Sequence, residues 1–324
     1  MHQLIRAIET YALRHANASG LAVAPMPGVR MKVVARPSSR FDAVYRPLVC
    51  LILQGAKHLS VGSEERLVRA GQTLIVSADV PVAARIVEAS PDRPYIALAI
   101  DLDVVRLREV ALRIGDSSQA TQRPPHTLFA IDTEAAALDC AARLLQLVDR
   151  PDAIPLLQPG IMQELHYWLL AGPHGTALRA LANPGGYAHR LVPAIAILQA
   201  EYRSRITTGR LAAAVAMSAS NFYKYFKQLT SLTPGKYQKH LRLIEALRLM
   251  SESGCSASSA AMEVGYESVS QFTREYRRHF QAPPKRDSLR RLTTARRDSA
   301  SLAAATTRQA GQNSRKMEST ESSV

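Results

Sequence analysis

The sequence predicts an α+β protein of several domains, with a β-barrel and a helical extension in its N-terminal half and an all-α domain in its C-terminal half. Three observations predict this class. Short apolar runs punctuated by glycine and proline recur from about residue 29 to residue 102, which is typical of a small barrel or sandwich. Helical periodicity replaces this pattern after Asp101. The 324 residues are enough for roughly two domains of ~150 residues each.

Composition excludes several classes of protein. Apolar residues make up 47% of the chain and charged residues 21%, so a folded globular protein is expected. The longest apolar runs are far shorter than the ~20 residues of a membrane span, and residues 1–21 lack the apolar core of a signal peptide. Cys50, Cys140 and Cys255 have no C-x-x-C spacing, which argues against a disulfide framework and a zinc site. We therefore expect a cytoplasmic protein with no membrane partner and no cofactor.

The N-terminal half divides into strands and then helices. The strands, each a short apolar run between turn signals, are predicted over Leu48–Leu53, Thr73–Val76, Val82–Val87 and Tyr95–Ile100. Two helices are predicted over about residues 133–148 and 158–170. The first presents an apolar face that either packs on the barrel or pairs two protomers, and that consists of Leu138, Leu144, Leu145 and Val148.

Two changes in composition set the expected domain boundaries. The tetrapeptide Asn183-Pro184-Gly185-Gly186 is the clearest linker signal. From Ser288 the chain is rich in Ser, Thr, Ala, Arg and Gln without periodicity, which predicts a disordered tail. The expected parts are an N-terminal helix (1–24), a barrel domain with helices (25–185), an all-α domain (186–288) and a basic tail (289–324).

Basic residues are concentrated toward the C-terminus. The formal net charge is +14, and residues 1–190 contribute only +3 of it, from 20 basic and 17 acidic side chains. Residues 191–288 contribute +7 and the tail +4. This distribution indicates that the C-terminal domain binds a polyanion such as nucleic acid.

The C-terminal domain contains the same short plan twice. A short helix over 211–218 and a longer one over 219–229 are followed, about fifty residues later, by a short helix over 257–264 and a longer one over 269–280. A short helix, a tight turn and a longer basic helix form the helix-turn-helix arrangement, whose second helix enters the DNA major groove. Apolar residues at helical spacing form the buried stripes of the longer helices, namely Phe222, Tyr225, Phe226 and Leu229, and Phe272, Tyr276 and Phe280.

A basic helix face is in most proteins only a solvated surface, but two such helices in tandem favour DNA binding. A helix predicted over about 235–250 joins them and is roughly 24 Å long at ~1.5 Å per residue. That length can hold two recognition helices near the ~34 Å repeat of one DNA turn.

The C-terminal residues also resemble a known family. Residues 191–287 are similar to the tandem helix-turn-helix domain of the AraC/XylS transcriptional regulators, most clearly in the stretch from Val264-Gly-Tyr-Glu-Ser to Phe280 and in Ala282-Pro-Pro-Lys-Arg-Asp287. The region of about 25–185 resembles the cupin-like sensor domain of one AraC-type subgroup, through Tyr45–Lys57 and Glu88–Tyr95. The resemblance implies a DNA-binding transcription regulator with double-stranded DNA as its partner.

The resemblance also implies which residues meet DNA. Its base-contacting positions fall on Ser220, Tyr223 and Lys224 in the first recognition helix and on Val269, Ser270 and Arg274 in the second. Charge and position assign phosphate contacts to Lys227, Arg277 and Arg278. Two positions depart from the family pattern. Ala216 and Gln281 stand where the family has glycine, and a left-handed residue with a Cβ costs on the order of 1 kcal/mol.

The N-terminal domain shows no set of metal ligands and no catalytic residues. His58 is the only histidine between Gly20 and Ala120, whereas a metal-binding cupin needs several converging histidines and an acid. No nucleophile, base and orienting group are spaced for catalysis, so we expect no enzyme. A small barrel can instead hold a ligand, and the polar candidates to line such an effector pocket are Gln54, Lys57 and Arg85.

Three functions compete at this point. The first is a regulator whose DNA binding responds to an unknown small-molecule effector. The second is a constitutive DNA-binding regulator whose barrel is only an interaction module, and the third is a cupin enzyme with a basic appendage. RNA polymerase and a second copy of the chain, forming a homodimer, are further candidate partners. The sequence does not determine the effector, the operator, or whether the protein activates or represses.

Overall fold

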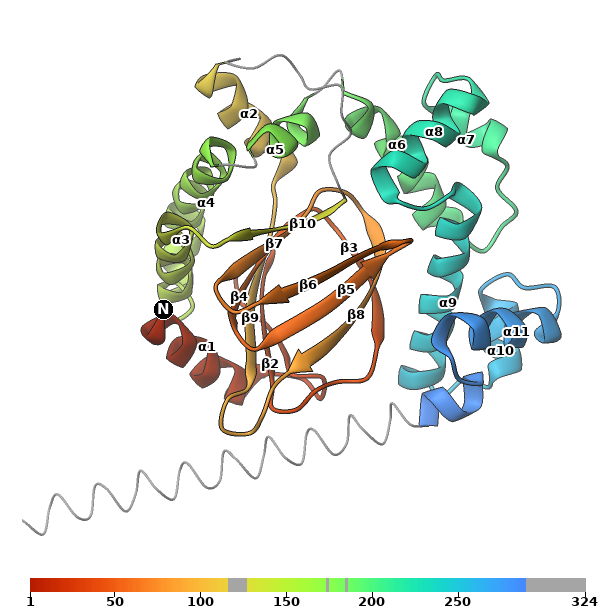
Figure 1. Ribbon diagram of the computed structural model, residues 1–324, viewed down its shortest axis with the longest axis horizontal. Helices are drawn as coiled ribbons and strands as arrows, with labels where there is room; N and C mark the ends of the chain where they lie inside the picture. The colour runs from red at the N-terminus through yellow and green to blue at the C-terminus, as the bar shows by residue number, and fades with distance from the viewer. Residues whose placement is uncertain (116–126, 173–174, 184–185, 290–324) are drawn as a thin grey trace, which may run out of the picture.

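The computed structural model describes residues 1–115, 127–172, 175–183 and 186–289. It confirms the α+β class, with a β-rich N-terminal half and a helical C-terminal half (Figure 1). The predicted basic tail lies outside the described residues from 290 onward. Among the described residues, no helix is long and apolar enough to cross a membrane.

In the described residues, ten antiparallel strands form two sheets. The six-stranded sheet has the order β1 (Leu21–Val23), β2 (Val29–Val34), β9 (Tyr95–Asp101), β4 (Leu48–Gln54), β7 (Gln72–Val76), β10 (Leu128–Asp132). The four-stranded sheet has the order β3 (Phe41–Tyr45), β8 (Val80–Glu88), β5 (Ala56–Val61), β6 (Glu64–Arg69). The four predicted strands are present, as β4, β7, β8 and β9.

The predicted β-barrel needs one correction: its strands form two separate sheets and do not close into a barrel. Within the described chain, β1 and β10 are the edges of one sheet and β3 and β6 the edges of the other, and no ladder joins the two. Alternating hydrophobicity in a sequence shows only that one face of a strand is buried. Whether sheet edges pair into a barrel depends on strand order and twist, which that pattern does not contain.

Strand sequences reflect what covers each face. In β5 the inward positions Lys57, Leu59 and Val61 are buried, whereas His58 and Ser60 between them are half-buried. Strand β4 is buried at six of its seven positions because the second sheet covers one face and helices cover the other.

Helices from the N-terminal half cover the outer face of the larger sheet (Figure 1). They are α1 (His2–His15), α2 (Val104–Ile114), α3 (Ala135–Gln146), the 3-10 turn η1 (Pro151–Ala153), α4 (Ile154–Ala171) and α5 (Gly175–Ala182). On α3, Leu144 and Leu145 are buried in this core, and Leu138 and the following Val148 pack against it. This apolar face therefore packs on the sheet, which was one of its two predicted roles.

The C-terminal half is helical throughout its described length. Its helices are α6 (Tyr187–Glu201), α7 (Thr208–Ala214), α8 (Ala219–Thr230), α9 (Pro234–Glu252), α10 (Ala257–Glu263) and α11 (Val269–Phe280). Five of them begin at a hydroxyl side chain that accepts a hydrogen bond from the backbone N–H three residues later, and these caps are Thr207, Ser218, Thr233, Ser256 and Ser268. Such caps contribute about 1 kcal/mol each, so the helix starts are encoded locally.

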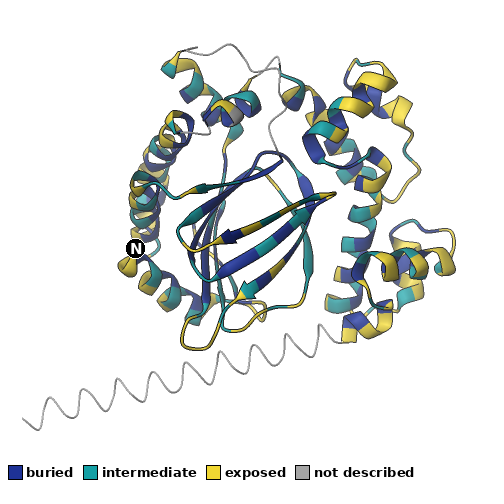
Figure 2. Cartoon of the chain, in the orientation of Figure 1, coloured by how far each residue is buried: buried dark blue, intermediate teal, exposed yellow. Residues whose placement is uncertain are grey.

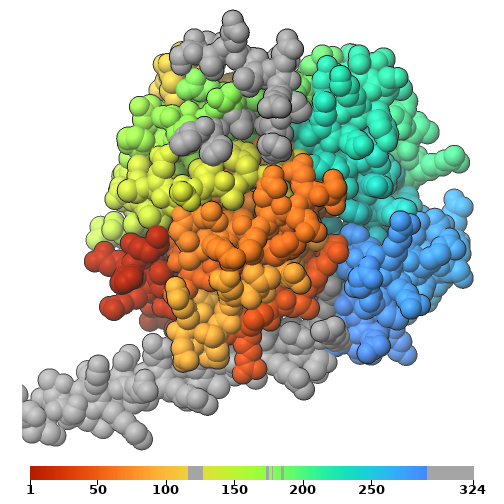
Figure 3. Space-filling view, in the orientation of Figure 1, coloured from red at the N-terminus to blue at the C-terminus, as the bar shows by residue number. Residues whose placement is uncertain are grey.

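The two helix-turn-helix halves have separate cores. Phe222, Phe226 and Tyr237 of the first half belong to the same apolar cluster as the interior between the two sheets. Phe272 and Tyr276 belong to a smaller cluster confined to the second half. Figure 2 shows the buried faces of these helices turned inward, and Figure 3 shows the C-terminal helices forming one continuous surface with the strands.

Arg242 on α9 holds the second half against the first. Its Nε donates to the carbonyl of Tyr202 (2.7 Å), and Nη2 donates to the carbonyls of Arg203 and Ser204 (3.0 and 3.1 Å). Its Nη1 donates to the carbonyl of Gly265 in the second turn (2.8 Å). One guanidinium thus joins the end of α6 to the turn before the second recognition helix.

We expect Arg242→Lys to lower the free energy of unfolding of the C-terminal helices by about 2 kcal/mol, because an ammonium cannot span both loops as the planar fork does. Hydrogen exchange of the α11 amides measures this loss. Arg248→Lys is the matched control, since Arg248 lies on the same helix in exposed ion pairs with Glu245 and Glu252 worth less than about 1 kcal/mol. Equal effects of the two substitutions would contradict the role assigned to Arg242.

Candidate nucleic-acid interface and adjoining cavity

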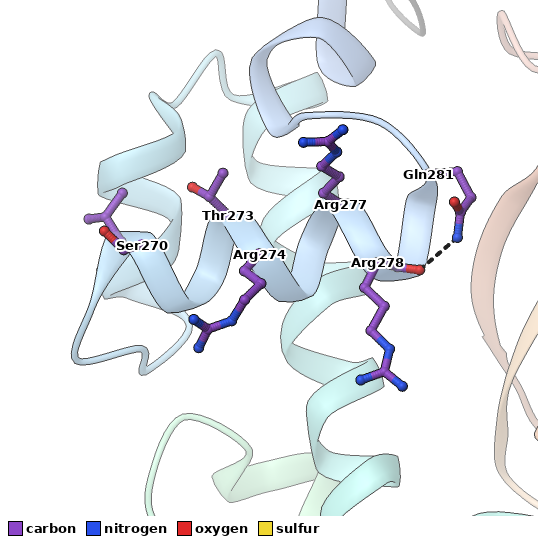
Figure 4. A pocket seen from close by; sticks show the side chains of 7 residues that line it. Ser270, Thr273, Arg274, Arg277, Arg278 and Gln281 are labelled. Atoms are coloured by element: carbon purple, nitrogen blue, oxygen red, sulfur yellow. Dashed lines mark hydrogen bonds between the residues drawn. The ribbon is translucent and has the colours of Figure 1, made fainter.

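Helix α11 presents one open, mostly polar face. A shallow depression runs along it, lined by Val269, Ser270, Thr273, Arg274, Arg277, Arg278 and Gln281 (Figure 4). The opposite face buries Phe272, Tyr276 and Phe280. All five residues predicted for this helix therefore lie together on its open face. The side chain of Gln281 donates a hydrogen bond to the Arg278 carbonyl at the end of this face (2.9 Å).

Helix α8 repeats this arrangement. Its buried residues are Phe222, Phe226, Leu229 and Thr230. The four predicted DNA-contacting residues Ser220, Tyr223, Lys224 and Lys227 are exposed, and the Tyr223 side chain is 45% exposed. Helix α9, which separates the two recognition helices in the chain, has 19 residues and is thus about 28 Å long.

The cations on the two recognition helices make no ion pair within the described part of the chain. Among the described residues, no acid lies within ion-pair distance of Lys224, Lys227, Arg274, Arg277 or Arg278. Other cations of the same domain are paired: Arg203 with Glu263, Arg210 with Glu201, and Lys239 with Glu275. The uncompensated positive charge is therefore available to an external polyanion.

The turns before the two recognition helices differ in a way that the sequence predicts. In the first turn Ala216 has φ +49°, so a residue with a Cβ occupies a left-handed position. Gln281, which ends α11, also has a left-handed backbone, with φ +59°. In the second turn the corresponding residue is Gly265, with φ +85°. A Cβ on Gly265 would lie 1.9 Å from the carbonyl oxygen of Arg203, so that close approach requires glycine.

The second recognition helix also contacts the smaller sheet. His279 Nε2 donates to Asp42 Oδ1 of β3 (2.8 Å), and Arg40 Nη2 donates to the same oxygen (2.9 Å). Burial by itself raises the pKa of Asp42, but the hydrogen bonds from His279 and Arg40 outweigh burial and hold the pKa below its usual value. The ring of His240, whose pKa burial lowers to about 4, lies 4.6 Å from the His279 ring.

A cavity of about 430 Å³ lies between the two sheets. Its wall includes Lys57, one of the three predicted effector residues. The other two are placed elsewhere: Gln54 donates to the carbonyl of Pro94 (2.7 Å), and Arg85 is exposed on the outer face of β8. His58 also lies on that outer face, 3.5 Å from Glu65.

Fold and site together define a two-domain protein with a tandem helix-turn-helix domain. Residues 25–177 match the family model described as the N-terminus of AraC-type transcriptional regulators, and residues 211–297 match a helix-turn-helix domain. The chain belongs to the AraC/XylS family of transcriptional regulators.

Individual relatives agree with this assignment. The transcriptional activator RhaS of Pectobacterium carotovorum is 31% identical over 101 residues, which is 31% of this chain and 36% of RhaS. This chain therefore aligns with only about a third of the length of RhaS. The transcriptional regulator YdeC of Bacillus subtilis is 22% identical over 236 residues, which is 72% of this chain and 80% of YdeC.

A solved structure shares the two-domain fold. ToxT of Vibrio cholerae superposes with a TM-score of 0.51 at 10% identity, covering 80% of this chain and 94% of ToxT. At that identity the likeness concerns the fold alone.

Several residues of the site were not found from the sequence. Thr273 follows Val269 by four positions and precedes Arg277 by four, so helical spacing alone could have placed it on the open face of α11. Asp42 and His279 are 237 positions apart, and no local pattern connects them. Tyr95 lines the cavity, but the sequence predicts only that it belongs to an apolar strand.

We expect Ala216→Gly to raise the free energy of unfolding by up to about 1 kcal/mol, because glycine removes the strain of a left-handed residue with a Cβ. Ala213→Gly is the matched control: Ala213 is exposed within α7, where glycine costs about 0.5–1 kcal/mol. Urea unfolding of the full chain measures both changes. Destabilisation by both substitutions would show that the turn is not strained.

The Asp42 contact predicts a pH dependence. The pKa of Asp42 is lower in the folded protein than in the unfolded chain, where it is about 3.9. Ionised Asp42 therefore stabilises the folded protein fully above that pH, and this stabilisation is lost as the pH falls through the pKa of the folded state. Asp42→Asn is therefore expected to be less stable than the wild type near pH 6, with the difference shrinking below about pH 4. Asp139→Asn, which alters an exposed ion pair, is the control and is expected to change little. Urea titrations at several pH values test this.

Proposed function

We propose that the protein is a sequence-specific DNA-binding transcription regulator that reads the major groove with α8 and α11. The observation behind this proposal is the pair of exposed basic recognition helices, each following a short helix and a tight turn. The cations on their open faces make no ion pair with the residues that the structure describes. A helix in the major groove reads base edges with side chains from its first turns.

Roles within the two helices follow from their positions. Ser220, Tyr223 and Lys224 on α8 and Val269, Ser270 and Arg274 on α11 lie in the first two turns and are assigned to bases. Arg274 suits a bidentate contact to guanine. Lys227, Arg277 and Arg278 lie further along the helices and are assigned to phosphates.

The N-terminal domain is proposed to bind a small effector in the cavity between the sheets. Its volume of about 430 Å³ lies within the usual range for small-molecule sites. ToxT structures have been solved with an unsaturated fatty acid and with a naphthyl-butenoic acid, which supports a ligand in a protein of this fold.

Strand β3 is the proposed route from the cavity to the DNA-binding helices. Phe41, Ala43 and Tyr45 line the cavity, while Asp42 between them contacts His279 on α11. A ligand that shifts β3 therefore alters the contact that holds the second recognition helix. Effector and DNA then affect each other's binding reciprocally.

Selection from random duplexes, followed by footprinting over a salt series, tests the DNA-binding proposal. We expect two protected major-groove segments about one helical turn apart. Arg274→Ala is expected to weaken binding to the selected site by about 1–3 kcal/mol and to relax specificity at one position. Lys227→Ala is expected to weaken binding to all DNA sequences by a similar factor. It is also expected to reduce the slope of log affinity against log salt concentration by about one.

Arg248→Ala is the control for these variants, because Arg248 is a basic residue of α9 already paired with Glu245 and Glu252. We expect it to leave DNA affinity unchanged. Salt-sensitive DNA binding with no preferred sequence would contradict the proposal of sequence-specific recognition.

A further inference from the structure

The open face of α11 carries two side chains with methyl groups beside its cations. Val269, Thr273 and Arg277 follow one another at intervals of four residues, so they form one row along the helix. Figure 4 shows Thr273 and Arg277 on one side of the helix and Arg274 and Arg278 on the other. The row therefore places the methyl groups of Val269 and Thr273 about 6 Å apart along the helix axis, at ~1.5 Å per residue.

Val269 lies on this face without belonging to a core. It is the first residue of α11, it follows the capping residue Ser268, and its side chain is half-buried. Within the described chain, Val269 is not among the residues that form the small core of the second half or that pack against it. Valine is also a weaker helix former than leucine or alanine. Neither core packing nor helix stability accounts for a valine here, and its exposed methyl surface is available to a binding partner.

The first recognition helix supports a base-reading role for Thr273. Both helices have 12 residues, begin after a capping serine and end at a left-handed residue, which is Ser231 (φ +55°) or Gln281 (φ +59°). The two helices therefore correspond position by position. Tyr223, which is assigned to bases, is the fifth residue of α8, and Thr273 is the fifth residue of α11. By this correspondence Thr273 belongs with Arg274 in the base-reading set of α11.

The chemistry of these two side chains selects one base. Thymine is the base that presents a methyl group in the major groove, and apolar side chains and the threonine methyl contact it there. Val269 has no donor or acceptor, so it distinguishes bases only by such a contact. At the two corresponding positions α8 has Ala219 and Tyr223, so the pair of β-branched side chains is particular to α11.

We propose that Val269 and Thr273 recognise thymine by contact with its 5-methyl group, in the half-site that α11 occupies. Base pairs are stacked about 3.4 Å apart, so side chains about 6 Å apart on one helix reach neighbouring pairs. This inference rests on the proposed DNA-binding function, which it deepens by naming a base in the recognised sequence and the two residues that select it.

The test uses the full-length protein and the selected duplex, in which each thymine of the protected segments is replaced singly by deoxyuridine. Uracil pairs with adenine as thymine does and lacks only the 5-methyl group, so the loss of affinity measures contact with that methyl. We expect one or two thymines to lose about fourfold in affinity when their methyl is removed. This ratio is expected to stay constant over a salt series, because a methyl contact releases no counterions.

Substitutions in α11 connect the effect to the two side chains. Val269→Ala and Thr273→Ser each remove a methyl group and are expected to reduce the ratio of thymine to uracil affinity below about twofold at one of those positions. Thr273→Val keeps a methyl group and removes the hydroxyl, so it is expected to retain the ratio. Met262→Ala is the control, because it removes a 59% exposed apolar side chain from α10, outside the open face. We expect it to bind both duplexes as the wild type does.

Three outcomes would overturn the inference: no thymine is sensitive to uracil, the sensitivity persists in both Val269→Ala and Thr273→Ser, or Thr273→Val loses the ratio. Each of these is measured on a duplex that the protein prefers, so each leaves the proposed function intact. A selection that yields no preferred sequence contradicts the proposed function itself, and the inference is overturned with it.

Discussion

The arrangement of the two recognition helices depends on one side chain in the middle of α9. Arg242 donates to carbonyls at the end of α6 and to the carbonyl of Gly265, so one guanidinium bridges two loops that are far apart in the sequence. The ion pair of Arg203 with Glu263 lies beside this bridge. Gly265 fits beneath the carbonyl of Arg203 only because it has no Cβ. Backbone carbonyls at helix ends lack partners within their own helix, and a planar cation with five N–H groups satisfies several of them at once.

A second constraint places the two halves of the DNA-binding domain in different environments. The core of the first half is continuous with the interior of the β-sandwich, through residues such as Phe226 and Tyr237, and the Tyr237 hydroxyl donates to the carbonyl of Asp79 (2.9 Å). The second half has its own small core, and His279 on α11 makes a polar contact with Asp42 on the edge strand β3. The second half is thus attached to the smaller sheet by polar contacts at its periphery, whereas the first half shares a buried apolar core with the two sheets.

Much of the fold could be predicted from local sequence. The strands around Leu51 and Leu98, the helices that follow, and the tandem helix-turn-helix plan agree with the structure because each depends on periodicity, turn residues and caps within a short stretch. The left-handed turn at Ala216 was also readable, since the family pattern has glycine there. The predicted β-barrel was wrong in its closure, because edge pairing between strands is a property of the assembled sheets.

The sequence by itself determined the class of the chain and the exposed faces of α8 and α11, because helical spacing decides which side chains share a face. Only the tertiary structure decided that Lys57 shares a cavity with Tyr95, that Arg85 does not, and that Asp42 meets His279. Those relations join strands and helices far apart in the chain. They are set by strand order and by how the layers pack, and no local pattern of residues encodes either.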